Sequence, residues 1–192
     1  MLIRFGAILP GISIVLLFSI IRWGFSLTSY GDFNTCIYSL IQTPLVSLGA
    51  SPFTFMLLIM LCSLLWFFGL HGANMIDPFM QAINAPAIEA NANALAAGKA
   101  APYIVNKPFV DSFVNMGGTG VTIGLIIAIY LVGRKNKPFM VVNNLAAAPG
   151  IFNINEPLMF GLPLVLNPIM FIPFILTPMI CISTAYFATS FG

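Results

Sequence analysis

Charged residues are scarce in this sequence. Its 192 residues include only 7 Lys and Arg, 5 Asp and Glu and one His, so that 6% of the chain is charged. Soluble domains average about 25% charged residues, and a chain with so few charges cannot cover a water-exposed surface. We therefore predict an integral membrane protein. The formal net charge of +2 is too small to indicate binding to nucleic acid, and no such partner is predicted.

The residue types that hold metals or form covalent intermediates are also few. The three cysteines, odd in number and widely spaced, form no metal or redox motif and are interpreted as small apolar packing residues: Cys36, Cys62 and Cys181. The single histidine, His71, has no Cys or Asp cluster beside it, so neither a metal site nor a cofactor is predicted. The glycine-rich residues 117–120 lack the Lys-Ser/Thr of a phosphate-binding loop, which favours a turn or close helix packing. No nucleophile–base pair supports an intramembrane enzyme.

Long apolar segments predict membrane-spanning helices. A helix needs about 20 apolar residues, at about 1.5 Å each, to cross the hydrocarbon. Four segments approach this length: residues 5–21, 53–70, 114–132 and 169–187. No A-x-A-like cleavage site follows the first segment, so we interpret it as a transmembrane helix kinked at Pro10-Gly11 and not as a signal peptide. The basic residues of the run 134–137 follow the third segment, and the positive-inside rule places them in the cytoplasm.

The segments between these spans are more polar. In residues 32–49, apolar residues recur mostly at three- and four-residue steps, which predicts an amphipathic helix in the membrane interface. The alternative is that these residues form the edge of the following helix and pack on protein instead of lying in the interface. Residues 69–74 contain two glycines and a histidine and predict a helix end and a turn. Residues 82–101 are rich in alanine and weakly polar, which predicts an extramembrane or interfacial helix and loop.

Prolines interrupt the apolar C-terminal part at intervals of five or six residues: Pro157, Pro163, Pro168, Pro173 and Pro178. Each lacks a backbone N–H and opposes the helical turn before it, so one straight helix cannot run through the stretch. The stretch is nevertheless too apolar for a soluble loop. Broken or re-entrant backbone that lines a cavity at membrane depth fits both observations. The predicted fold class is therefore all-α, a polytopic α-helical membrane protein with broken helices and re-entrant hairpins.

Glu156 is the only charged residue between Phe139 and Gly192. A charge at the bilayer centre costs about 2.5–3.5 kcal/mol on insertion scales, so such a residue normally faces a water-filled cavity or a polar partner. Together with Asn153 and Asn155 it offers several hydrogen-bond acceptors and donors, which is the lining that sugar hydroxyls need. The alternative is a structural glutamate that caps a half-helix or pairs with an arginine elsewhere.

The other ionisable candidates are less distinctive. His71 lies between Gly69 and Gly72 at the end of the second apolar segment, where a structural histidine is the alternative to one that binds a ligand. Asp77 and Asp111 lie near the ends of predicted spans, and we expect both to be solvated.

Three motifs resemble one protein family. Residues 147–161 (Ala-Ala-Pro-Gly-Ile-Phe-Asn-Ile-Asn-Glu-Pro-Leu-Met-Phe-Gly), followed by Leu-Pro-Leu-Val-Leu-Asn-Pro, are similar to the membrane IIC component of the bacterial sugar phosphotransferase system. The branch they resemble is that of lactose, cellobiose and diacetylchitobiose. Two further motifs resemble the same family: residues 66–74 (Trp-Phe-Phe-Gly-Leu-His-Gly-Ala-Asn) and residues 113–120 (Phe-Val-Asn-Met-Gly-Gly-Thr-Gly). The resemblance covers nearly the whole chain.

The resemblance implies a permease of the bacterial plasma membrane that transports sugar by group translocation. A β-linked disaccharide such as cellobiose, lactose or diacetylchitobiose binds in a cavity, and a domain with re-entrant hairpins carries it across. A IIB partner, phosphorylated on a cysteine, then phosphorylates the sugar and supplies the phosphoryl-transfer chemistry. In the family, the Glu of the Asn-Glu-Pro motif and the His of the Gly-Leu-His-Gly motif contact the sugar. This implies sugar contacts for Glu156 and His71, with Asn155, Asn74 and Asn153 expected beside them.

The family resemblance also suggests how the chain is organised. Family members are longer, and this chain resembles their second half. We therefore expect a partial IIC membrane domain, in which residues 1–50 form a first span and the amphipathic helix and residues 51–192 form the sugar-binding transport region. The expected partners besides the sugar and IIB are the lipid bilayer and, for the full-length protein, a second copy in a homodimer. A truncated, non-transporting membrane remnant or interaction subunit is the alternative.

Overall fold

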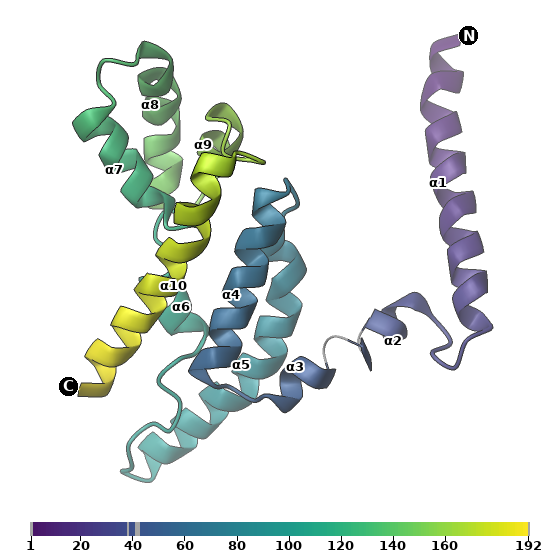
Figure 1. Cartoon of the computed structure of the whole chain (residues 1–192). Coiled ribbons are helices and arrows are strands. Elements are labelled where there is room, and N and C mark those ends of the chain that lie inside the picture. Colours follow the sequence, from purple (N-terminus) through teal and green to yellow (C-terminus); the bar gives the residue numbers. More distant parts are fainter. Residues whose placement is uncertain (1, 38, 41–42, 192) are drawn as a thin grey trace. The chain divides into compact units, whose positions relative to one another are not determined.

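A computed structural model describes residues 2–37, 39–40 and 43–191 of the chain (Figure 1). Every regular element in these residues is a helix, which confirms the predicted all-α class. The chain forms two compact units, Met1–Ser47 and Leu48–Gly192. The first unit contains α1 (Leu2–Ser26), α2 (Phe33–Ile37) and α3 (Thr43–Ser47). The second contains α4 to α10.

Helix α1 matches the first predicted span. Its segment Ile8–Ser26 is long and apolar enough to cross a membrane, with a mean hydropathy of 1.9. Pro10 lies inside the helix. The side chains of residues 8–20 are all exposed, as expected of a helix whose apolar surface faces lipid.

The predicted amphipathic helix over residues 32–49 falls partly on residues 38 and 41–42, which lie outside the described residues. The described residues from 33 to 47 are helical and comprise α2, a π-helical pair at residues 39–40, and α3. A single helix over the whole stretch therefore stays a prediction. Asp32 caps α2, because its carboxylate accepts from the Thr35 N–H at 2.9 Å and from the Thr35 hydroxyl at 2.7 Å. These hydrogen bonds, with the backbone N–H contributing most, hold the pKa of the Asp32 carboxyl below its ordinary value.

The second unit begins with the helices α4 (Pro52–Phe67) and α5 (Gly72–Ala96), which pack side by side (Figure 1). The Oγ of Ser51 caps α4 by accepting from the Thr54 N–H at 3.1 Å, and Pro52 occupies the first helical position. The turn predicted within residues 69–74 is confirmed, since α4 ends at Phe67 and α5 begins at Gly72. Helix α5 therefore starts well before residue 82, where the sequence predicted a helix, and continues past Pro78 and Pro86.

The third predicted span, residues 114–132, is helical only in its second part. Helix α6 (Lys107–Phe113) ends before it, residues 114–121 form a loop, and α7 (Thr122–Val132) is apolar but has only 11 residues. The loop has positive φ angles at Gly117, Gly118, Gly120 and Val121, a conformation that glycine adopts without steric cost. A Cβ on Gly117 would lie 2.3 Å from the backbone N of Ile123. The glycines thus form a turn, which was one of their two interpretations.

The predicted break in the proline-rich part is confirmed. Helix α9 (Glu156–Gly161) is short, residues 162–167 form a loop, and α10 (Pro168–Phe191) follows. Pro157 and Pro168 lie at helix starts, where a missing N–H leaves no bond unmade. Helix α10 is long and apolar enough to cross a membrane, with a mean hydropathy of 1.8. Helix α8 (Lys137–Ile151), capped by Asn136, had no counterpart in the predictions.

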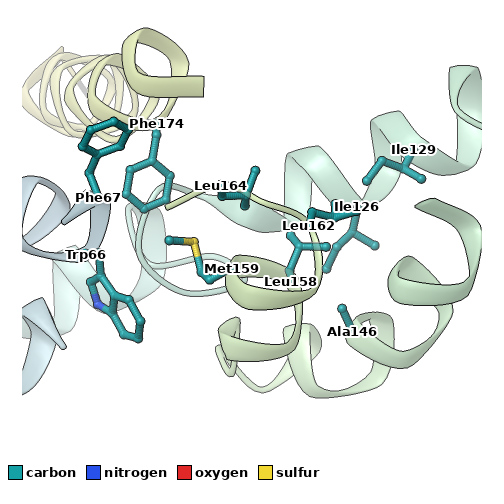
Figure 2. Close-up of a cluster of buried hydrophobic side chains, with 10 residues drawn as sticks. All are labelled: Trp66, Phe67, Ile126, Ile129, Ala146, Leu158, Met159, Leu162, Leu164 and Phe174. Carbon is teal, nitrogen blue, oxygen red and sulfur yellow. The ribbon is translucent and has the colours of Figure 1, made fainter. Parts of the chain in front are cut away.

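A buried apolar cluster holds the elements around α9 together (Figure 2). Leu158 and Met159 of α9 lie in its middle, between side chains of α4 on one side and of α7 and α8 on the other. The cluster consists of Trp66, Phe67, Ile126, Ile129, Ala146, Leu158, Met159, Leu162, Leu164 and Phe174. A backbone hydrogen bond adds a further link, because the Leu166 N–H donates to the Phe67 carbonyl at 3.0 Å. The end of α4 and the loop before α10 are therefore joined directly.

Candidate functional site

A cavity of about 400 Å³ lies within the second unit. Its walls come from α4, α5, α6 and α10, from the first residue of α9, and from two loops, residues 114–121 and 152–155. Apolar side chains form much of the wall, among them Ile59, Ile76 and Met80. About half of the lining residues are polar or charged. Apolar walls with converging polar groups are the usual form of a small-molecule site.

Two ionisable side chains from different helices meet in this cavity. His71 is the N-cap residue of α5, and Glu156 is the first residue of α9. The His71 Nδ1 accepts from the Asn74 backbone N–H at 3.3 Å, so Nε2 is the ring nitrogen that can donate toward the cavity. Nε2 lies 3.4 Å from Glu156 Oε1. The pair presents one N–H donor and one carboxylate, which are the groups that recognise a hydroxyl.

A glycine makes this meeting of helices possible. A Cβ on Gly72 would lie 2.2 Å from the Cys62 carbonyl oxygen and 3.0 Å from the Trp66 ring. Only glycine therefore allows α5 to start so close to α4. The indole of Trp66 supports His71 directly, with the two ring centroids 4.5 Å apart. The position of His71 is thus fixed by the α4–α5 contact and by the capping hydrogen bond.

Three buried polar atoms of the residues that line the cavity have no hydrogen-bond partner within the described residues. They are Ser63 Oγ, Trp66 Nε1 and Glu156 Oε2. A buried polar group without a partner costs about 1–3 kcal/mol. Two of these atoms can donate and two can accept, so hydrogen-bonding capacity at the cavity wall is left unused by the described residues.

Asn153 and Asn155 join the two loops of the cavity wall. The Asn153 Oδ1 accepts from the Gly117 N–H at 2.9 Å, and the Asn155 Nδ2 donates to the Thr119 carbonyl at 2.9 Å. Asn153 itself has a φ of 63°, a conformation that asparagine tolerates better than most residues. A Cβ on Gly118 would lie 2.7 Å from Asn155 Cγ, so the loops are in close contact. One half of each amide is therefore engaged in holding the wall beside Glu156.

A second polar cluster lines the cavity. Asp77 and Asp111, expected to be solvated near span ends, have side chains that are 47% and 45% exposed, and both lie in the cavity lining beside Lys107. The Lys107 Nζ is 2.9 and 3.2 Å from the two oxygens of Asp111 and 3.6 Å from Asp77 Oδ1. The Asn115 Nδ2 donates to Asp111 Oδ1 at 2.9 Å. Helix α5 begins at residue 72, which places Asp77 in the second turn of a helix on the cavity wall.

The structure thus brings together four of the five predicted site residues. His71, Asn153, Asn155 and Glu156 line the cavity, whereas Asn74 does not and its side chain is exposed. Asn74 contributes to the site through its backbone N–H, which orients the histidine. Lining residues that the sequence did not single out are Ser63, Lys107, Asn115 and Thr119. A signal in the sequence could have placed Asp77 in the cavity wall. Residues 73, 76, 77 and 80 are spaced as on one face of a helix, and all four line the cavity.

Comparisons with known proteins agree with this arrangement. A family model described as "Phosphotransferase system, EIIC" matches residues 2–178. The chain is 40% identical over 190 residues to an oligo-beta-mannoside-specific EIIC component of Bacillus subtilis (strain 168), covering 98% of this chain and 42% of the relative. It is 36% identical over 210 residues to a cellobiose-specific EIIC component of Lactococcus lactis subsp. lactis (strain IL1403), covering 97% and 42%.

A solved structure gives the same result. The crystal structure of the transporter ChbC, the IIC component from the N,N'-diacetylchitobiose-specific phosphotransferase system, matches with a TM-score of 0.71 and 36% sequence identity. The match covers 98% of this chain and 44% of that one. The chain therefore spans less than half the length of the relatives it matches. Family model, sequence relatives and fold together show that the chain belongs to the EIIC family of the phosphotransferase system.

Proposed function

We propose that the cavity binds a β-linked disaccharide, such as cellobiose, lactose or diacetylchitobiose, for transport by group translocation. The observation that carries the proposal is the His71–Glu156 pair, which lies at a cavity wall beside buried polar atoms that have no hydrogen-bond partner in the part of the chain that the structure describes. The printed names of the relatives support it, since they include proteins specific for oligo-β-mannosides, cellobiose and N,N'-diacetylchitobiose. This chain matches less than half of each of those relatives. The remaining part of a full-length permease would complete the transport pathway.

The residues of the site would have distinct roles. Glu156 would accept hydrogen bonds from sugar hydroxyls, including the one to be phosphorylated, and would help to remove its proton. A general base must lie within hydrogen-bond reach of that proton, which the position of Glu156 on the cavity wall allows. His71 would donate from Nε2 to a sugar oxygen. Asn153 and Asn155 would hold the wall and offer the unengaged halves of their amides to the sugar.

The partners and location follow from the same proposal. A IIB protein or domain would deliver the phosphoryl group, because the chain belongs to a family of phosphotransferase components. The chain would lie in the bacterial plasma membrane as a multi-pass protein, in which residues 1–50 form the first span with its polar connection and residues 51–192 form the transport region. Two helices, Ile8–Ser26 and Pro168–Phe191, are long and apolar enough to cross a membrane. The full-length protein would be a homodimer.

The test replaces the two site residues in a full-length relative. We expect Glu156→Gln and His71→Ala, introduced at the equivalent positions of the B. subtilis oligo-β-mannoside EIIC, to abolish sugar uptake while membrane insertion persists. Glu89→Gln is a matched control, since Glu89 is exposed on α5 and does not line the cavity. Normal uptake by both site variants would refute the site. In parallel, the purified chain should bind members of a panel of β-linked disaccharides, measured by calorimetry.

A further inference from the structure

The charges in the cavity do not balance. Among the described residues of its lining, four side chains carry a formal charge at neutral pH: Asp77, Asp111, Glu156 and Lys107. Three carboxylates and one ammonium leave a net charge of −2.

The one cation offers little to an incoming anion. Lys107 Nζ is in contact with both oxygens of Asp111 and with one oxygen of Asp77. Its side chain is 26% exposed, whereas those of Asp77 and Asp111 are 47% and 45% exposed. The surface that faces a ligand here is therefore carboxylate more than ammonium. Elsewhere in the lining, Glu156 has the His71 imidazole as its partner, and no Lys or Arg among the described residues forms an ion pair with it.

The walls strengthen the effect of this charge. Ile59, Ile76, Met80 and Pro178 line the same cavity and keep high-dielectric solvent away from part of it. Charges close to low-dielectric walls interact several times more strongly than they would in bulk water, and salt screens them less. A neutral sugar is unaffected by the net charge and gains from the many acceptors. An anionic sugar of the same shape meets net repulsion.

We propose that the cavity selects uncharged sugars by charge and repels the same sugar once it carries a phosphate or a carboxylate. The inference rests on the proposed function and adds a driving force for product release. In the transfer step, the S–P bond of the IIB phosphocysteine breaks and an O–P bond to the sugar forms. The hydroxyl proton passes to Glu156 and then to water, and the cysteine thiolate is regenerated. The uncharged ligand has then become a phosphate ester with a charge of about −1.5 to −2. The cavity that held the substrate disfavours the product.

The test compares ligands that differ only in charge. Calorimetry on the purified chain in phosphatidylcholine nanodiscs gives the Kd for cellobiose, for its 6′-carboxylate analogue and for cellobiose 6′-phosphate. We expect both anionic ligands to bind at least about tenfold more weakly than cellobiose at low salt, and the difference to narrow at high salt. The ratio of anionic to neutral Kd should fall about fivefold in Asp77→Asn, which removes one negative charge and keeps the two Lys107–Asp111 contacts.

Glu89→Gln provides the matched control, because it removes the same charge from the same helix outside the cavity. It should leave the ratio unchanged. The inference is overturned if cellobiose binds and the anionic ligands bind equally well, or if Asp77→Asn changes the ratio no more than Glu89→Gln. Absence of cellobiose binding would overturn the proposed function, and the inference with it. The two failures are therefore distinguishable.

Discussion

Gly72→Ala tests whether the close contact of α4 and α5 builds the site. The added Cβ would lie 2.2 Å from the Cys62 carbonyl oxygen, and Cβ atoms do not approach other heavy atoms within 3.0 Å. The helices must therefore separate locally by at least the 0.8 Å between these two distances. The clash is with backbone, so a rotamer change cannot relieve it. Overpacking of this kind costs about 1–3 kcal/mol of stability.

The same shift should weaken binding. His71 directly precedes Gly72, and its Nε2 starts 3.4 Å from Glu156 Oε1, so a displacement of this size is enough to separate the pair. We expect the melting temperature of the purified chain in detergent, followed by tryptophan fluorescence, to fall by roughly 2–12 °C. Cellobiose affinity, measured by calorimetry on the folded fraction, should fall at least about tenfold, since a factor of ten corresponds to about 1.4 kcal/mol.

Gly124→Ala is the control for the chemical change itself. Gly124 lies inside α7, and a Cβ there would meet nothing within 4 Å. This variant should be as stable as the parent or more stable, by about 0.5–1 kcal/mol, because alanine favours a helix interior. If Gly72→Ala melts and binds like the parent while Gly124→Ala behaves as expected, the contact does not position the histidine and the reasoning is wrong.

Further predictions concern the core and the asparagines. Leu158→Ala removes a fully buried side chain from the middle of the apolar cluster and should lower the free energy of unfolding by about 2–5 kcal/mol, whereas Leu131→Ala, at an exposed position, should have a small effect in the same thermal assay. Asn155→Ala removes the donor to the half-buried Thr119 carbonyl and should lower cellobiose affinity about tenfold, because the hydrogen bond that holds the two loops of the cavity wall together, worth about 1 kcal/mol, is lost and so is an amide facing the sugar. Asn74→Ala should change that affinity by less than about twofold, because only its backbone N–H contributes to the site; an effect as large as that of Asn155→Ala would show that the Asn74 side chain reaches the sugar.

Local features of the sequence were sufficient to predict part of this molecule. The isolation of Glu156 in an apolar stretch and the proline spacing around it depend only on neighbours in the chain. They predicted both a polar site and the break between α9 and α10. The turn before α5 was likewise predictable, because Gly69 and Gly72 flank it closely.

Features that depend on distant contacts could not be predicted from local patterns. The pairing of His71 with Glu156 requires α5 and α9 to be brought together by the packing of α4, which no periodicity reveals. The placement of Asp77 and Asp111 in the cavity depends on Lys107, whose positive charge compensates part of their cost. The 11-residue length of α7 was missed because hydropathy does not distinguish an apolar loop from an apolar helix.

The hydrogen bond from the Leu166 N–H to the Phe67 carbonyl restricts how the molecule can rearrange. It links Phe67, at the end of α4 and shortly before His71, to Leu166, in the loop that follows α9. Breaking a peptide hydrogen bond away from water costs several kcal/mol, so pulling these two segments apart inside a bilayer is unfavourable. In the transport function proposed above, α4, α9 and the start of α10 would therefore move together as one rigid body. The boundary between moving and stationary parts would lie outside these segments.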